Sequence, residues 1–436
     1  MHKLYFCMLI CLANLLHGQG AHAQTLTFDE ILKQAIAHSF DLKIGSLDVA
    51  IGEQRLAEAR AMYLPTLSMR LASEYLYDLS KDATGTVAVG DTLISGNEST
   101  YQDSLSLSAG YLLYDFGARS LKYQNAKRQV QVARFQAEQA LVDLRDQALA
   151  LYSHGLILHK QLAAWTILLA QRNEVYRLTV RLQTAGTMGK VELGKAGIAV
   201  AEAVQTIAAY RLELEGVVQD IGFLTGQTYD ASDIEFTDLQ AAESSEGQTD
   251  VHNLPEIKAY AVEIEKKKTE YQIARREWLP SLNLYSSYRL YGSDPSSATD
   301  SFESIREKNA TVGVVLDMNL FNGFSDRAKA RRLQSELRRL EVERDKKIAD
   351  KKRLMNTLAE KAILYKQYTD EWHSFRSALD EQGIMTERLA GQRIIDRIGF
   401  LEQQGQQLEK SLDLQVRQVE RDMNALQLHL LAIGSS

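Results

Sequence analysis

The chain has 436 residues and a formal net charge of −7, and its four prolines stand at 65, 255, 280 and 295. Length alone would allow about three ordinary domains, but the proline-free intervals 118–254 and 296–436 are typical of long helices rather than of compact α/β units. The interspersed charges of both signs argue against a nucleic-acid-binding protein, which needs a basic excess or stripe.

Residues 1–23 have the pattern of a secretory signal peptide. Lys3 gives a positive start, an apolar stretch follows, and Ala21-His22-Ala23 forms an A-x-A cleavage signal. Both cysteines, Cys7 and Cys11, lie in this segment, so we expect the mature chain to have no disulfide, thiolate metal site or thiol nucleophile. An uncleaved membrane helix is the less favoured alternative, because the apolar stretch is shorter than the roughly 20 residues that cross a bilayer. Any membrane crossing is therefore expected to use strands.

Residues 27–63 are predicted to form one continuous helix. Apolar side chains recur there at helical spacing, and Thr27 with Glu30 makes the pattern of a capping box. Tyr63-Leu64-Pro65 marks the end of the helix, because the residue before a proline is biased away from helical backbone angles.

Two strands and a long helical hairpin are expected next. Residues 67–77 and 104–114 alternate between two sets of side chains, as strands with two different faces do, and the polar stretch between them is predicted to be a loop. A helix is predicted over 118–184, a glycine-marked break over 185–189, and a return helix over 191–224. At ~1.5 Å per residue the first of these helices would be about 100 Å long, so it needs partner helices along its length.

The second half of the chain is predicted to repeat this order after an acidic linker over 230–250. Trp278-Leu279-Pro280-Ser281-Leu282 parallels Tyr63-Leu64-Pro65-Thr66-Leu67, and two further pairs of segments keep the same offset. The linker holds seven carboxylates and no lysine or arginine, so we expect it to be irregular and exposed. The predicted domains are a first repeat over 24–229, the linker, and a second repeat over 251–436.

The second repeat is predicted to contain its own strand pair and helical hairpin. Residues 282–290 and 311–320 alternate as strands do, and a glycine-containing turn over 321–324 leads the second strand into a helix that extends to about residue 389. A break over 390–392 separates this helix from a last one.

Four amphipathic strands in two hairpins cannot close a membrane barrel within one chain. The smallest membrane barrels have about eight strands, and open edges are not tolerated in lipid. Three chains would supply twelve strands, and the alternative is a small soluble sheet packed against the helices. Aromatic side chains at or near the strand ends fit the girdle of a membrane barrel. They are Tyr75, Tyr77, Tyr101, Tyr111, Tyr114, Tyr285, Tyr288, Tyr291 and Phe321.

The order of these features resembles the bacterial outer-membrane efflux protein family, the TolC-type channels, over essentially the whole mature chain. The resemblance rests on the two Leu-Pro strand entries, on the two hairpin tips, on Leu320-Phe321-Asn322-Gly323-Phe324 and on its weaker counterpart Leu113-Tyr114-Asp115-Phe116-Gly117. It implies a mainly α chain with a small β part. Long antiparallel helical hairpins would form a periplasmic coiled-coil barrel, and four strands per chain would contribute to a shared twelve-stranded trimeric transmembrane β-barrel.

The resemblance also implies partners and a place in the cell. The chain would be a homotrimer in outer-membrane lipid, and it would extend into the periplasm. A periplasmic adaptor, or membrane fusion protein, would join it to an inner-membrane transporter. The assembly would be a tripartite efflux pump or a type I secretion system.

The family closes its channel at the hairpin tips, so the resemblance gives gating candidates there. They are Gly186, Glu192, Gly391, Arg393, Asp396 and Arg397. Glu192 stands about two turns after the first tip glycine, and Asp396 is the nearest acid after the second. Three copies of Asp396 would form a ring that favours cations, and Arg393 and Arg397 could pair with carboxylates of neighbouring chains. The alternative is that these are ordinary solvated charges at helix ends.

No catalytic, cofactor-binding or metal-binding pattern stands out in the sequence. Residues 189–196 resemble a phosphate-binding loop without its final Ser or Thr, and His154 and His159 lack the spacing of a shared helical face. The basic run 327–353 is expected to be a solvated helix face. The chain is therefore predicted to be a passive exit duct and not an enzyme. A periplasmic coiled-coil adaptor without membrane strands is the main alternative, and a secreted hydrolase is a second one.

Overall fold

The structure, a computed structural model, divides the chain into two compact units. It describes residues 24–76, 86–89, 92–95, 100–240, 250–305 and 307–434, so the predicted signal peptide and Tyr77 lie outside the described residues. Unit 1 consists of Met1–Leu47, Arg134–Lys258 and Asp345–Ser436, and unit 2 consists of Asp48–Ala133 and Ala259–Arg344.

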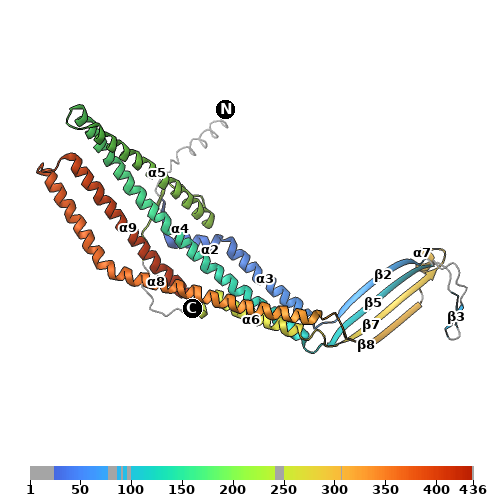
Figure 1. The fold of residues 1–436 in the computed structure, drawn as a ribbon. Helices are drawn as coiled ribbons and strands as arrows, with labels where there is room; N and C mark the ends of the chain where they lie inside the picture. The colour runs from blue at the N-terminus through green and yellow to red at the C-terminus, as the bar shows by residue number, and fades with distance from the viewer. Residues whose placement is uncertain are drawn as a thin grey trace, which may run out of the picture. The chain divides into compact units, whose positions relative to one another are not determined.

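Helices make up most of the described chain, so the prediction of a mainly α fold is confirmed (Figure 1). The helices are α2 (Phe28–His38), α3 (Phe40–Ala61), α4 (Ala118–Thr184), α5 (Lys190–Thr225), α6 (Pro255–Ala274), α7 (Ala298–Glu303), α8 (Ser325–Gly391) and α9 (Arg397–Gly434). The strands are β1 (Gln24–Leu26), β2 (Thr66–Leu76), β3 (Thr86–Val89), β4 (Thr92–Ser95), β5 (Thr100–Tyr114), β6 (Ile234–Phe236), β7 (Ser281–Asp294) and β8 (Glu307–Asp317). Across the described ranges, no helix combines the length and the apolar character needed to cross a bilayer.

The predicted single helix over 27–63 is wrong at one residue. Ser39 has φ −45° and ψ 125°, and this non-helical backbone separates α2 from α3. Its hydroxyl oxygen accepts a hydrogen bond from the Leu42 backbone N–H at 3.3 Å, so the serine caps the helix that follows it. The predicted capping box of Thr27 and Glu30 is confirmed at the start of α2.

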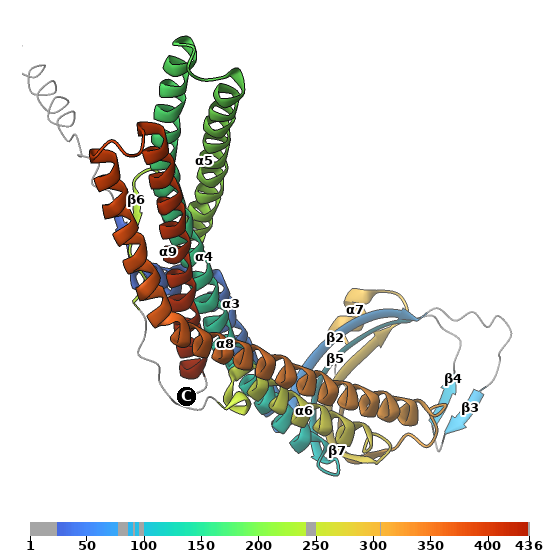
Figure 2. The ribbon, with the colours of Figure 1, turned by 60° about the vertical axis from the view of Figure 1, so that its left-hand side comes forward.

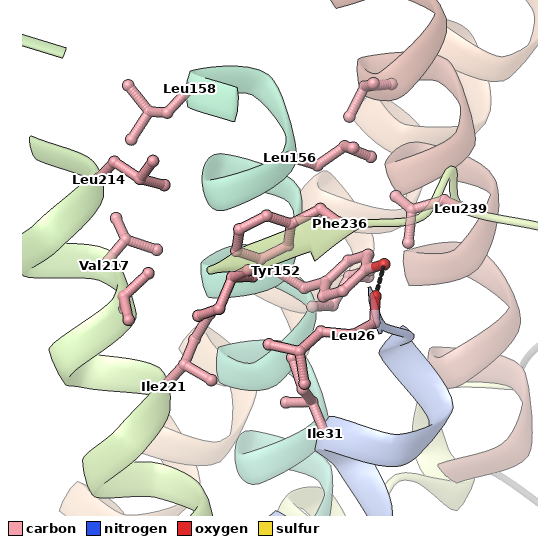
Figure 3. Packing of buried hydrophobic residues seen from close by; sticks show 14 of the residues in the cluster. Leu26, Ile31, Tyr152, Leu156, Leu158, Leu214, Val217, Ile221, Phe236 and Leu239 are labelled. Carbon is pink, nitrogen blue, oxygen red and sulfur yellow. Dashed lines mark hydrogen bonds between the residues drawn. The ribbon is translucent and has the colours of Figure 1, made fainter. Parts of the chain in front are cut away.

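The core of unit 1 gathers helices and two short strands from distant parts of the sequence (Figure 3). β1 pairs in parallel with β6, which brings Leu26 beside Phe236. Tyr152 of α4 is fully buried between them, and its hydroxyl donates to the Leu26 or the Thr237 carbonyl oxygen, at 2.9 and 2.7 Å. The prediction that 230–250 is wholly irregular and exposed is therefore wrong at β6. Its apolar side chains alternate with an exposed Glu235, as a half-buried strand requires.

Unit 2 contains a four-stranded antiparallel sheet in the order β2-β5-β7-β8 (Figure 1). The two predicted strand pairs thus join through β5 and β7 into one sheet. The fourth strand ends at Asp317 rather than at Leu320. Its neighbour β7 begins at Ser281, directly after Pro280, so residues 318–320 have no strand to pair with. The predicted loops also contain short elements, β3, β4 and α7.

Two helical hairpins belong largely to unit 1 (Figure 2). α4 and α5 form the first, and its bounds differ from the predicted ones by one residue at each end of α5. α8 and α9 form the second.

Candidate functional site

The first hairpin turns at Gly186, which has φ +79° and open space around it. The Gly186 N–H donates to the Gln183 carbonyl at 3.0 Å, and the Thr187 N–H donates to the Leu182 carbonyl at 2.9 Å. These two bonds define a Schellman motif, whose left-handed residue is usually glycine. The predicted turn glycine of the first tip is confirmed.

The second hairpin makes the same turn at a different residue from the one predicted. The Arg393 N–H donates to the Ala390 carbonyl and the Ile394 N–H to the Leu389 carbonyl, both at 3.0 Å. Arg393 itself has φ +59°, whereas Gly391 is the last residue of α8 and has no positive φ. The left-handed position equivalent to Gly186 is therefore Arg393, because the hydrogen-bond pattern and not the nearest glycine sets its place.

A left-handed arginine carries a steric cost that glycine avoids, roughly 1 kcal/mol. We expect Arg393→Gly to raise the free energy of unfolding by about this amount, and Arg393→Asn to recover part of the gain, because asparagine tolerates this backbone conformation. Chemical denaturation of the detergent-solubilised protein measures both. Arg397→Gly, in the first turn of α9, is the control and should destabilise. A loss of stability in Arg393→Gly would contradict the assignment of the turn.

Each return helix has one carboxylate at its N-terminus, but the two helices place it at different positions. Glu192 is in the first turn of α5, and its Oε2 lies 2.6 Å from the position that a Cβ on Gly189 would take. Asp396 directly precedes α9, and its Oδ1 accepts a hydrogen bond from the Gly399 N–H at 2.8 Å. Asp396 thus occupies the capping position that Gly189 has in the first hairpin, and Gly399 occupies the position of Glu192. Negative charge at either position interacts favourably with the helix dipole.

Arg397 provides an electrostatic link between the two hairpins. Its guanidinium lies 5.2 Å from the centre of the Phe400 ring. The pKa of Glu174 on α4 is held below its ordinary value mainly by a hydrogen bond from Arg177, and the positive charge of Arg397 adds to this effect from α9.

A groove of about 410 Å³ lies between α4, α5 and α9 near the tips. Glu192 lines it, but the other five gating candidates do not. Arg172 of α4 crosses this region: it donates to the Ala199 carbonyl of α5 at 3.0 Å and pairs with Glu409 of α9 at 3.3 Å. Sequence reasoning missed Arg172, because no local pattern distinguishes it from other arginines on a long helix.

The sheet of unit 2 has one apolar and one polar face. One row across its strands reads Met69, Leu107, Tyr288 and Ala310, and the adjacent row on the other face reads Ser68, Ser108, Ser287 and Thr311. The apolar face is uncovered on both outer strands, where Met69 is 73% and Val312 is 74% exposed. The outer strands β2 and β8 each pair on one side only in the part of the chain that is described.

Aromatic side chains form clusters at both ends of this sheet. The ring centres of Tyr75 and Tyr101 are 4.6 Å apart at one end, and those of Tyr114 and Phe116 are 4.8 Å apart at the other. The predicted positions at strand ends are wrong for two residues. Tyr288 lies in the middle of β7, and Tyr285 lies on the polar face with its ring over Gly313, where a Cβ would come within 2.7 Å of the ring.

Comparisons with known proteins give one family match, over part of the chain, and one shared fold. Residues 31–227 match the family model described as outer membrane efflux protein. Similar solved structures include CusC, studied for transmembrane channel formation, with a TM-score of 0.74 and 15% identity over 93% of this chain and 91% of that chain. The outer membrane protein VceC from Vibrio cholerae has a TM-score of 0.72 and 14% identity, over 93% of this chain and 96% of that chain. The CmeC outer membrane channel of Campylobacter jejuni has a TM-score of 0.73 and 13% identity, over 94% of this chain and 85% of that chain. Among curated protein sequences, none matches.

Proposed function

Residues 31–227 match the outer membrane efflux protein family, and from this match we propose that the chain is a member of that family and an outer-membrane exit duct. It conducts substrate passively from an inner-membrane transporter, through a periplasmic adaptor, to the cell exterior, and it has no catalytic activity of its own. The transporter belongs either to a tripartite efflux pump or to a type I secretion system.

The observation that carries this proposal is the uncovered apolar face of the four-stranded sheet. β2 and β8 are each 11 residues long, which matches the roughly 9–11 residues of a strand that crosses a bilayer. Their alternating side chains would place the apolar face toward lipid and the polar face toward a water-filled lumen, and the two aromatic clusters would lie at the two interfaces.

The two open edges of the sheet support a trimer. Lipid cannot satisfy unpaired backbone groups, so β2 and β8 need partners from other chains. The sheet is antiparallel with an even number of strands, so β8 of one chain and β2 of the next run in opposite directions and can pair. Three chains give a closed barrel of twelve strands, within the range of known membrane barrels. The alternative of a periplasmic adaptor without membrane strands is not favoured, because it leaves this sheet without a role.

Native mass and cross-linking test the shared barrel together. Both cysteines lie within residues 1–23, so single cysteines can be placed on a cysteine-free mature chain. We would combine Ser68→Cys on β2 with a cysteine at 309, 311 or 315 on β8, and oxidise the protein extracted from outer membranes in mild detergent. A ladder of two and three chain masses is expected for at least one pair. The control pair Ser68→Cys and Ser108→Cys faces each other within one sheet and should give a single chain mass. A monomer that needs no detergent would contradict the duct.

We propose that the tips are the gate of this duct, with Asp396 and its flanking arginines holding the closed state. Exposed charge pairs contribute ~0.2–1 kcal/mol each, so three symmetric copies would change the open fraction by about tenfold. We therefore expect Arg393→Ala, Asp396→Ser and Arg397→Ala together to raise resting conductance in planar bilayers and susceptibility to antibiotics. Asp396→Ser keeps a capping oxygen, so lost helix capping is not the cause of a leak. Unchanged conductance and susceptibility would show that these residues do not hold the duct closed.

A further inference from the structure

A second groove, of about 640 Å³, lies in unit 2 where β8 leads into α8. Its walls come from the end of α6, the connecting segment 318–324 and the first turns of α8. Three guanidinium side chains line it, those of Arg275, Arg327 and Arg331, together with the carboxylate of Asp326. The groove therefore carries a net positive charge.

The three arginines of this groove form no ion pairs with other described residues, unlike neighbouring basic residues of α8. Arg332 pairs with Glu336 at 2.7 Å, and Lys329 pairs with Glu277. Arg327 and Arg275 instead lie over aromatic rings, Arg327 at 5.4 Å from the centre of Phe324. An unpaired guanidinium in a groove is available to an anion, and its planar donors match the oxygens of a phosphate. The basic run 327–353 is thus not uniformly a solvated helix face.

The rim of the same groove is strongly apolar. Phe321 is 72% exposed, and Trp278, Leu320 and Phe324 are also exposed beside it. This segment directly follows the last residue of β8, so in the proposed duct it lies where the lipid-facing sheet ends. Tryptophan and phenylalanine with nearby arginine are typical of a membrane–water interface, where the apolar parts enter the lipid and the charges stay with the headgroups.

We propose that this groove binds the headgroup of an anionic phospholipid from the leaflet that faces the helices. Arg275, Arg327 and Arg331 hold the phosphate, and the acyl chains run along the exposed Leu320 and Phe321. Basic pockets beside membrane-spanning segments bind anionic headgroups by this chemistry. The inference rests on the proposed function, because it needs the sheet to be in a membrane. A free inorganic phosphate would use the same arginines but would not need the apolar rim.

Tryptophan fluorescence tests the site in the full-length protein. The chain has three tryptophans, and a background with Trp165→Phe and Trp372→Phe leaves Trp278 at the groove as the reporter. Purified protein in detergent micelles is titrated with brominated phosphatidylglycerol or brominated phosphatidylcholine. We expect phosphatidylglycerol to quench Trp278 at lower lipid fractions than phosphatidylcholine. Each single Arg→Gln change in the groove should raise the half-quenching fraction about fivefold, given ~1 kcal/mol per basic residue near a lipid surface.

A matched variant separates the groove from overall charge. Arg332→Gln, Arg338→Gln and Arg339→Gln remove three charges from the same helix outside the groove and should keep the preference for phosphatidylglycerol. Equal quenching by the two lipids, or equal effects of the two sets of substitutions, would overturn the proposal. So would full displacement of the lipid by millimolar inorganic phosphate, which would indicate a free-anion site only. The native mass of the same sample distinguishes the lipid site from the proposed duct. A mass of three chains together with equal quenching by the two lipids would refute the lipid site and leave the trimeric duct standing.

Discussion

We expect Val312→Arg to prevent the protein from accumulating in the outer membrane, whereas Thr311→Arg, one residue earlier, should not. Both positions lie near the middle of β8, and they point to opposite faces of the sheet. Val312 is on the uncovered apolar face, in line with Leu67 and Ala109. An arginine on the lipid face near the bilayer midplane costs about 2–4 kcal/mol, and the trimer would bear this cost three times. Thr311 is on the polar face, where an arginine would be hydrated in the lumen.

The comparison is read from outer-membrane fractions by immunoblot, with export activity measured in the same cells. Thr311→Arg should keep the level of the protein and change the conductance of the duct, because it would add three positive charges to the lumen. Equal loss of both variants from the membrane would show that the two faces of β8 do not differ in their contact with lipid and water. The shared barrel would then be wrong.

Tyr152→Ala has the second largest expected effect, a loss of roughly 3–5 kcal/mol per chain in the free energy of unfolding. The ring is fully buried and lies 5.5 Å from the ring centre of Phe236 and 5.9 Å from that of Phe28. Its hydroxyl also donates a hydrogen bond to the backbone carbonyl of Leu26 or of Thr237, which lie on separate segments. Removing the side chain leaves a cavity where β1 and β6 meet (Figure 3), and the Thr237 carbonyl loses the hydroxyl as a donor, whereas the Leu26 carbonyl keeps the Thr237 N–H at 3.2 Å.

Two further variants identify the cause of that loss. Tyr152→Phe keeps the ring and removes the hydroxyl, so it should cost about 1–3 kcal/mol. Tyr176→Ala, on the same helix but 38% exposed, should cost less than ~1 kcal/mol. Denaturant midpoints of the detergent-solubilised proteins measure all three changes. Similar midpoints for Tyr152→Ala and Tyr176→Ala would be incompatible with the packing described.

Much of the fold could be predicted because its signals are local and repeated. The bounds of α4 follow from a proline-free run between two glycine-containing turns. The break at Ser39 was also present in the repeat: α6 begins at Pro255, the residue that the constant offset pairs with Phe40, where α3 begins. β6 was missed because its few apolar residues lie among carboxylates, and its burial depends on pairing with a distant strand.

The tips could be predicted only in part, because residue type alone does not determine which residue of the turn adopts the left-handed conformation. Glycine usually takes the left-handed position. In the second hairpin Arg393 takes it, although Gly391 is only two residues away. The role of Asp396 as a helix cap follows from that shift by two residues. Arg172 and Glu409 meet only because two hairpins pack together, and no spacing along the sequence indicates such a pair.

The core of unit 1 has a consequence for the order in which the chain can fold. It joins Leu26, close to where β1 begins, to Leu430, in the last turns of α9. Contacts between residues so far apart in the sequence form late, because a very long loop must close first. During export the chain emerges gradually, so this core stays open until α9 has arrived. The apolar strands of unit 2 emerge before α9 does, so their apolar faces are exposed to water in the meantime. We therefore expect the newly exported chain to be vulnerable to aggregation and proteolysis until its apolar strands are covered.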